Sequence, residues 1–264
     1  MTRAERFIRA CYLGAMVIFL LLPIAVVVAV SFSNTRFLIF PPHGFSLKWF
    51  SDVLSSSEFL WPLWNSIRLA LLATTVATIL VLPCVVALVR LRPRFTRTLE
   101  AVILAPLSLP TIILAIGLLF FSAQIALGGS FAALVAGHTV IVIPYMFRTC
   151  YAVYIDANAE MEEAARTLGA GPVYTFWRIS LPLIRPGIIA GGIFAFLMSF
   201  NEVPVALFLT NTKTTTLPVY MLSYLVYNYD PGVAAISTVQ IVVVIVGLFV
   251  LDRLFGVRRI VEAR

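Results

Sequence analysis

Four stretches of this chain contain no Asp, Glu, Lys or Arg. They cover residues 10–35, 69–89, 101–147 and 231–251, and their lengths are 26, 21, 47 and 21 residues. A helix needs about 20 apolar residues to cross the hydrocarbon core of a bilayer. The longest stretch has room for two crossings, and Gly128-Gly129 breaks it near the right place. These stretches predict a chain that folds inside a membrane.

The composition supports a membrane as the solvent. The chain is 61% hydrophobic and 12% charged, whereas soluble domains are about half apolar and about a quarter charged. A soluble fold could not cover this much apolar surface. The net charge of +7 would point to nucleic acid in a soluble protein, but the bilayer is the partner to consider first, and we expect no nucleic acid.

A further run, residues 186–212, is interrupted by one charge, Glu202. With it, we count six transmembrane helices in an all-α polytopic membrane protein. The expected spans are residues 10–31, 62–89, 101–123, 130–148, 187–209 and 232–252.

The cationic residues orient these spans. Fifteen Lys and Arg residues fall in segments 1–9, 90–97, 148–185 and 253–264, whereas Arg36, Lys48 and Lys213 fall in the intervening loops and Arg68 lies inside a span. By the positive-inside rule, both termini are cytoplasmic. The first apolar run exceeds the ~7–15 residues of a signal-peptide core, so we favour a retained helix over a cleaved signal.

The segment EEAARTLGAGPVYTFWRISLPLIRPG, residues 162–187, lies on the expected cytoplasmic side. Helix-forming residues predict a helix over 157–168, and Gly169 is the residue type that ends one. Pro172 suits the start of a second helix over 173–179, which Leu181-Pro182 would stop. Ala164 and Ala165 give the first helix a face for close approach. The segment is therefore either a solvated connector or a docking element.

The spacing in this segment resembles the EAA loop of binding-protein-dependent ABC importer permeases. The matching positions are Glu163, Ala164, Ala165, Gly169, Ile179, Leu181 and Pro182. In that family the loop carries the cytoplasmic coupling helix, which docks in a groove of the ATPase subunit. NSIRLALLATTVATIL (65–80) and PGIIAGGIFAFLMSFNEV (186–203) extend the resemblance over nearly the whole chain, and the chain most resembles the spermidine/putrescine permeases.

The resemblance implies a type I ABC importer permease (MetI-like) fold in a bacterial inner membrane. It divides the chain into an N-terminal helix and periplasmic loop at 1–61, a five-helix core at 62–253 with the EAA loop at 157–182, and a cytoplasmic tail at 254–264. It also implies an ATPase dimer, a periplasmic solute-binding protein and a second permease subunit, which we expect to be a different homologous chain.

Catalysis is expected from a partner. A P-loop needs a lysine after glycine, but Lys48 and Lys213, the two lysines of the chain, do not follow glycine. Cys11, Cys84 and Cys150 form no CxxC pair. We therefore expect no catalytic residue, no metal and no cofactor on this chain, with ATP and Mg used by the ATPase.

Glu202 is the one acid expected well inside a span, where a charge costs about 2.5–3.5 kcal/mol on insertion scales. We expect it to line the transport path with Asn201, Ser199 and Tyr145. The alternative is a structural ion pair with Arg68 or with a second permease subunit. His138 is expected to be a packing residue.

A single acid on the path favours a small organic cation such as putrescine or spermidine. Iron(III), thiamine, phosphonate and sulfate stay open as other cargoes of the same transporter class. A secondary transporter is less favoured because no internal repeat is visible and the loop would have no role.

Overall fold

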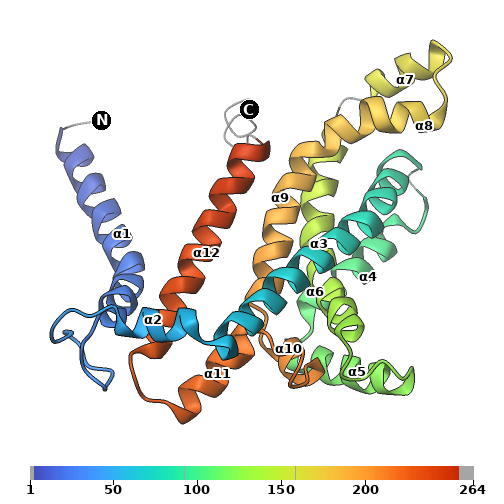
Figure 1. Ribbon diagram of the computed structural model, residues 1–264. Helices are drawn as coiled ribbons and strands as arrows, with labels where there is room; N and C mark the ends of the chain where they lie inside the picture. Colours follow the sequence, from blue (N-terminus) through green and yellow to red (C-terminus); the bar gives the residue numbers. More distant parts are fainter. Residues whose placement is uncertain (1–2, 92, 158, 256–264) are drawn as a thin grey trace. The chain divides into compact units, whose positions relative to one another are not determined.

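The computed structural model describes residues 3–91, 93–157 and 159–255, and these ranges contain helices but no strand (Figure 1). The all-α polytopic fold expected from the sequence is confirmed. The helices are α1 (Arg3–Ser31), α2 (Lys48–Ser55), α3 (Ser57–Leu91), α4 (Thr96–Ser108), α5 (Thr111–Gln124), α6 (Phe131–Ile155), α7 (Glu160–Thr167), α8 (Pro172–Thr175), the π-helical turn η1 (Phe176–Ser180), α9 (Leu181–Phe200), α10 (Pro204–Leu209), α11 (Leu217–Tyr227) and α12 (Gly232–Phe255).

The chain divides into two compact units. The first holds residues 1–60 and 220–245, and the second holds residues 61–219 and 246–264. Four of the cations used to orient the chain, Arg92, Arg258, Arg259 and Arg264, lie outside the described residues, as does nearly all of the expected tail 254–264. The expected domain boundary after residue 61 and the sidedness of the termini stay predictions.

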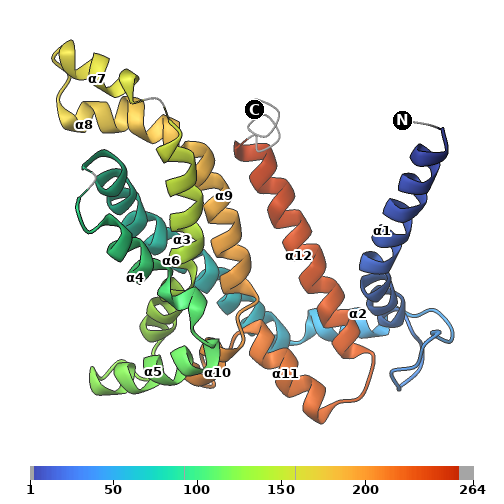
Figure 2. The same cartoon turned by 180° about the vertical axis from the view of Figure 1, so that it is seen from behind.

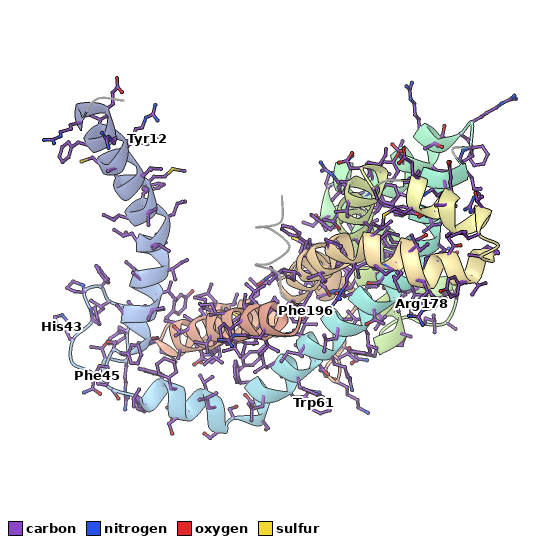
Figure 3. All side chains as sticks on the ribbon, turned by 90° about the horizontal axis from the view of Figure 1, so that it is seen from above. Tyr12, His43, Phe45, Trp61, Arg178 and Phe196 are labelled. Carbon is purple, nitrogen blue, oxygen red and sulfur yellow. The ribbon has the colours of Figure 1, made fainter. Side chains whose placement is uncertain are left out.

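In the first unit, the loop after α1 folds around aromatic side chains. The ring of Phe32 stacks on Phe45 at 5.2 Å and contacts Phe50 at 5.0 Å. Trp49 Nε1 donates to the Ser33 carbonyl at 3.0 Å. Figure 3 places His43 and Phe45 on this loop, and Tyr12 on the part of α1 that is distant from the loop. Almost none of α1 is buried within the structure, as expected of a helix that faces lipid or another chain.

The second unit is organised by α6 and α9, which lie side by side in both views (Figure 1, Figure 2). Two glycines of α9, four residues apart, permit the close approach. A Cβ on Gly187 would lie 2.8 Å from the Thr149 carbonyl oxygen, and one on Gly191 would lie 2.8 Å from Met146 Sδ. Small residues at this spacing let membrane helices pack backbone to backbone. The core around this contact includes Val142, Met146, Phe147, Ile184, Ala195, Val81 and Val85.

Within the described residues, five helices are long and apolar enough to span a membrane, and a bent pair, taken as one span, makes a sixth. The bent pair corrects the expected continuous span 101–123, because α4 and α5 meet at 103°. Leu109 between them is extended, with φ −92° and ψ 139°. Proline disfavours the helical conformation in the residue before it, so Pro110 ends α4 at Ser108 and starts α5.

The expected span 187–209 is also wrong in its second half. The helix ends at Phe200, and residues 204–209 form the separate short helix α10. Glu202 therefore lies in a break between two helices and not inside a continuous one.

The expected break at Gly128-Gly129 is confirmed. α5 ends at Gln124 and α6 begins at Phe131, with Gly129 in the left-handed region at φ +70°. The Ser130 hydroxyl accepts a hydrogen bond from the Ala133 N–H at 3.1 Å, which caps α6.

We predict that Gly191→Ala destabilises the protein by about 1–3 kcal/mol, as overpacking of a tight interior does. The added methyl would collide with Met146 and Thr149 on α6. The measurement is thermal unfolding of the purified protein in detergent.

Gly192→Ala is the matched control. Its Cβ would lie 3.9 Å from Thr74 Cγ2, an ordinary contact, and alanine favours a helix by up to about 1 kcal/mol over glycine. We expect no loss of stability. Equal losses for the two substitutions would contradict the close contact between α6 and α9.

Candidate functional site

The segment between α6 and α9 contains the short amphipathic helix α7, which is shorter than the expected helix over 157–168. Residue 158 lies outside the described part of the chain. Glu160, Glu162 and Glu163 occupy its first turn and Arg166 its last. Acids at the start and a base at the end complement the helix dipole, so α7 is stable over two turns.

Gly169 ends α7 as the sequence predicts. Its φ is +86°. The Gly169 N–H donates to the Arg166 carbonyl and the Ala170 N–H donates to the Ala165 carbonyl, both at 3.0 Å. This pair of bonds is the Schellman motif, which satisfies the last carbonyls of a helix. The sharp turn that follows brings α8 alongside α7 (Figure 1).

The expected stop at Leu181-Pro182 is wrong. The helix continues from Pro172 through η1 into α9 and ends at Phe200. Proline has no N–H and its ring clashes with the preceding turn of an α-helix. The π-helical residues 176–180 widen the turn ahead of Pro182, so the helix continues across it. Ile179 and Leu181 are half-buried and Pro182 is exposed.

The outer surface of this segment is unusually apolar. Leu168 is 88% exposed, and the other large exposed apolar side chains nearby are Met161, Val173, Tyr174 and Trp177. Glu163 and Ala164 are exposed and Ala165 is half-buried. Figure 3 shows Arg178 on the same segment. Sequence reasoning found Glu163, Ala164 and Ala165 but missed the exposed apolar side chains.

The inner face of α7 is held by a buried polar cluster on Glu162, which is 3% exposed. The Arg90 Nε donates to Glu162 Oε2 at 2.7 Å and its Nη2 donates to Oε1 at 3.2 Å. The hydroxyls of Tyr154 and Ser180 donate to Oε1 at 2.7 Å and 2.8 Å. We call these four residues the Glu162 cluster. One carboxylate thereby joins α3, α6, α7 and η1.

Arg90 and Tyr154 are also joined directly. The Arg90 Nε lies 3.0 Å from the Tyr154 hydroxyl oxygen, and the guanidinium carbon lies 4.2 Å from the centre of the Tyr154 ring. Sequence reasoning missed the cluster and treated Arg90 as one more cation beside the membrane. No local pattern marks the cluster, because its members lie far apart in the sequence.

The Glu162 carboxyl has a lowered pKa. Burial raises the pKa, but the hydrogen bonds from Tyr154, Arg90 and Ser180 and the charge of Arg90 together outweigh burial. All of these interactions favour the ionised carboxylate. Glu162 is therefore a carboxylate at neutral pH.

A cavity of about 850 Å³ lies beside the Glu162 cluster. Its walls come from α3 on one side and from α8, η1 and α9 on the other. The residues that line it are mainly apolar, and they include Ile79, Pro83, Val86, Thr175, Phe176, Trp177 and Leu181 together with Arg90, Tyr154, Glu162 and Arg166.

The four residues expected on a transport path lie on α6, near the end of α9 and in the break that follows α9. Glu202, 9% exposed, accepts the Val205 N–H at 3.2 Å through Oε1 and so caps the first turn of α10. Asn201 is exposed at the end of α9, and its Nδ2 donates to the Leu197 carbonyl. Ser199 is buried, and its hydroxyl lies 2.8 Å from His138 Nδ1 on α6. Tyr145 is half-buried, seven residues beyond His138 on the same helix.

The contacts of the described residues contain no ion pair between Glu202 and Arg68. Arg68 Nη2 donates to Asn65 Oδ1 at 3.3 Å, and its guanidinium carbon lies 4.2 Å from the Phe131 ring centre. The structural alternative for Glu202 within this chain is thus a backbone cap. His138, expected to be a packing residue, is buried and bonded to Ser199.

The loop over residues 210–216 is fixed to the first turns of α3. Trp61 Nε1 donates to the Lys213 carbonyl at 2.9 Å (Trp61 is labelled in Figure 3). Asn65 Nδ2 donates to the carbonyls of Lys213 and Thr215, and the Ser66 hydroxyl accepts the Leu217 N–H.

The described residues thus form a helical protein with several apolar spans and an exposed segment between two packed helices. A family model described as "Binding-protein-dependent transport system inner membrane component" matches residues 79–260. The match covers more than half of the chain, and the chain belongs to this family. It is a permease subunit of an ABC importer and a multi-pass protein of the inner membrane. Permeases of this class work with a binding protein and an ATPase.

Individual relatives give a mixed picture of cargo. The spermidine/putrescine transport system permease protein PotC of Escherichia coli (strain K12) is 29% identical over 91% of each chain. The molybdenum transport system permease protein ModB of Mycobacterium tuberculosis is 32% identical over 70% of this chain and 75% of the relative. A bacterial ABC transporter involved in import of the acidic polysaccharide alginate has the same fold, with a TM-score of 0.74 at 20% identity over 97% of this chain and 99% of that chain.

We predict that the stability difference between wild type and Glu162→Gln depends on pH. The pKa of Glu162 is lower in the folded than in the unfolded protein. Its contribution is thus fully present above the unfolded pKa, about 4.3, and is lost as pH falls through the folded value. In melting experiments, wild type should exceed the variant by about 1.5–3 kcal/mol between pH 8 and 5, with the gap closing below about pH 4.

Glu163→Gln is the control, because it makes the same charge change on the exposed side of α7. We expect its stability at pH 7 to lie within about 0.5 kcal/mol of wild type. A gap for Glu162→Gln that persisted unchanged to pH 3 would mean that the carboxylate charge is not what stabilises the cluster.

Proposed function

We propose that this permease imports a small organic cation, with putrescine or spermidine as the cargo. The observation that carries the proposal is the acid Glu202, buried at a break between two helices, in a chain that aligns with a polyamine permease over 91% of its length. A carboxylate in a low-dielectric site attracts a cation and repels an anion. The runner-up cargo is an oxyanion or metal species, which the similarity to ModB favours.

We propose that the segment from Glu163 to Pro182 couples this chain to the ATPase. Its support is the exposed apolar surface of Leu168, Val173, Tyr174 and Trp177. Apolar side chains gathered on one exposed segment mark a contact for a partner. The small side chain of Ala164 allows the partner to approach the backbone of α7 closely. The ATPase dimer binds and uses ATP and Mg. The termini and this segment are cytoplasmic.

The transport cycle we propose is alternating access. A loaded periplasmic binding protein docks on the outer loops, which include the fixed loop 210–216. Closure of the two ATPase subunits on ATP displaces the coupling segment, and the path opens outward. Hydrolysis returns it inward. One chain supplies half of the path, and a second, homologous permease supplies the other half.

We expect uptake of labelled putrescine or spermidine in cells that lack this chain to return with wild type and to fall about ten-fold or more with Glu202→Gln. Glutamine keeps an oxygen that can accept the Val205 N–H, so the substitution removes the charge and leaves the cap. The assay is uptake normalised to the amount of inserted permease.

Labelled molybdate is the comparison substrate in the same cells. Uptake of molybdate but of neither polyamine would overturn the cargo proposal. Polyamine uptake that is equal for wild type and Glu202→Gln would remove Glu202 from the path.

We predict that Gly169→Val reduces uptake about ten-fold while insertion stays normal. A side chain at φ +86° is strained by about 1–3 kcal/mol, and a Cβ at this position would meet no atom of this chain within 4 Å. The effect therefore comes from the shape of the turn alone.

Gly171→Ala is the matched control. Gly171 has φ −69° and also has open space around its Cβ position, so alanine fits there. Normal uptake by Gly169→Val, or an equal loss in Gly171→Ala, would count against a coupling role for this turn.

A further inference from the structure

The Glu162 cluster draws its members from elements far apart in the chain. Arg90 lies in the last turn of α3, Tyr154 lies in the last turn of α6, Ser180 ends η1, and Glu162 lies in α7. Every member contacts the same carboxylate. The four elements thus meet at this carboxylate.

The cluster is completely satisfied. Oε1 accepts three hydrogen bonds and Oε2 accepts one. A buried ion pair loses hydration when it forms, and well-packed apolar residues are often as stabilising. An ion pair with four hydrogen bonds provides a fixed geometry, because each donor must lie in a given direction from the carboxylate.

Apolar packing already joins α3, α6 and α9, whose buried core includes Leu88, Tyr154 and Ile184. The 850 Å³ space separates the apolar side chains of α3 from those of η1 and the start of α9. Arg90, Tyr154, Glu162 and Ser180 all line this space. In the described part of the chain, no residue of α7 is among the buried members of the apolar core, so Glu162 is the buried connection from α7 to the other elements.

α7 therefore has two faces with different tasks. Glu163, Ala164 and Leu168 point away from the unit and are exposed. Glu162 is buried and Arg166 lines the cavity, four residues further along. A force applied to the exposed face of this two-turn helix reaches the rest of the unit through the buried face.

We propose that Glu162 is a positioning residue that makes α7, the end of α3, the end of α6 and η1 move as one body. The inference rests on the proposed coupling role of this segment. Displacement of α7 then displaces three membrane helices together. Without the cluster, α7 would stay attached through its flanking chain and would move independently of α3.

The test measures distances in the full transporter. Spin labels are placed on Ala164→Cys in α7 and Leu80→Cys in α3, both exposed positions, after Cys11, Cys84 and Cys150 are replaced by alanine. Electron–electron double resonance is recorded without nucleotide and with trapped ATP–vanadate. With the cluster intact, we expect one narrow distance distribution that is the same in both states.

In Glu162→Gln and in Arg90→Met, we expect that narrow distribution to be lost and the α7–α3 distance to change on trapping. Asp156→Asn, an exposed acid near Tyr154, should leave the narrow distribution intact. The charge exchange Arg90→Glu with Glu162→Arg should restore it in part. A narrow, unchanged distribution in Glu162→Gln, or a broad one in the parent, would overturn the proposal.

A second readout separates coupling from folding. Import of labelled putrescine per ATP hydrolysed should fall about ten-fold in Glu162→Gln, with ATP hydrolysis maintained, whereas a folding defect lowers both in proportion. Cross-linking of Ala164→Cys to the ATPase tests the proposed coupling role itself. If that cross-link fails while the α7–α3 distribution is narrow and cluster-dependent, the coupling role is wrong and the rigid connection stands.

Discussion

The architecture of the second unit depends on the close contact between α6 and α9. Gly187 and Gly191 remove the side chains that would hold the two helices apart. Because these helices flank residues 156–180, their contact brings both ends of that segment together. The segment therefore leaves α6 and returns to α9 at nearly the same place. Within it, α7 and α8 fold back on each other. The Schellman turn at Gly169 and the acid-first, base-last pattern of α7 act inside that frame.

Buried charge in this protein follows the same rule at two places. Glu162 finds an arginine and two hydroxyl donors, and Glu202 finds a backbone N–H at the start of α10. In a medium without water, polar groups need partners within the protein. The break after Phe200 supplies a free helix start, which a continuous span would not. The buried acid and the interrupted helix therefore belong together, because the start of α10 provides the hydrogen-bond donor for Glu202.

The sequence predicts what local chemistry determines. Gly169 and Gly128-Gly129 end helices where expected, because left-handed backbone is cheap only for glycine. The number of crossings follows from the uncharged stretches. Two of the errors concern proline. Pro110 divides an expected span, whereas Pro182 does not stop a helix, since the π-helical turn before it accommodates it. Whether a helix ends at a proline or continues through it depends on tertiary packing. The Glu162 cluster was out of reach for the same reason, because its members are separated by up to 90 positions.

The anchoring of α3 has a consequence for insertions and deletions. Asn65 and Ser66 hold the loop 210–216 at one end of this helix, and Arg90 holds Glu162 near the other. Asn65 and Arg90 are 25 residues apart, which is about seven turns at 3.6 residues per turn. The two anchors thus lie on nearly the same side of the helix. Adding or removing one residue between them would rotate one anchor by about 100° relative to the other. The length of α3 is therefore constrained in whole turns, so homologous chains that keep both anchors should differ here by substitution rather than by insertion.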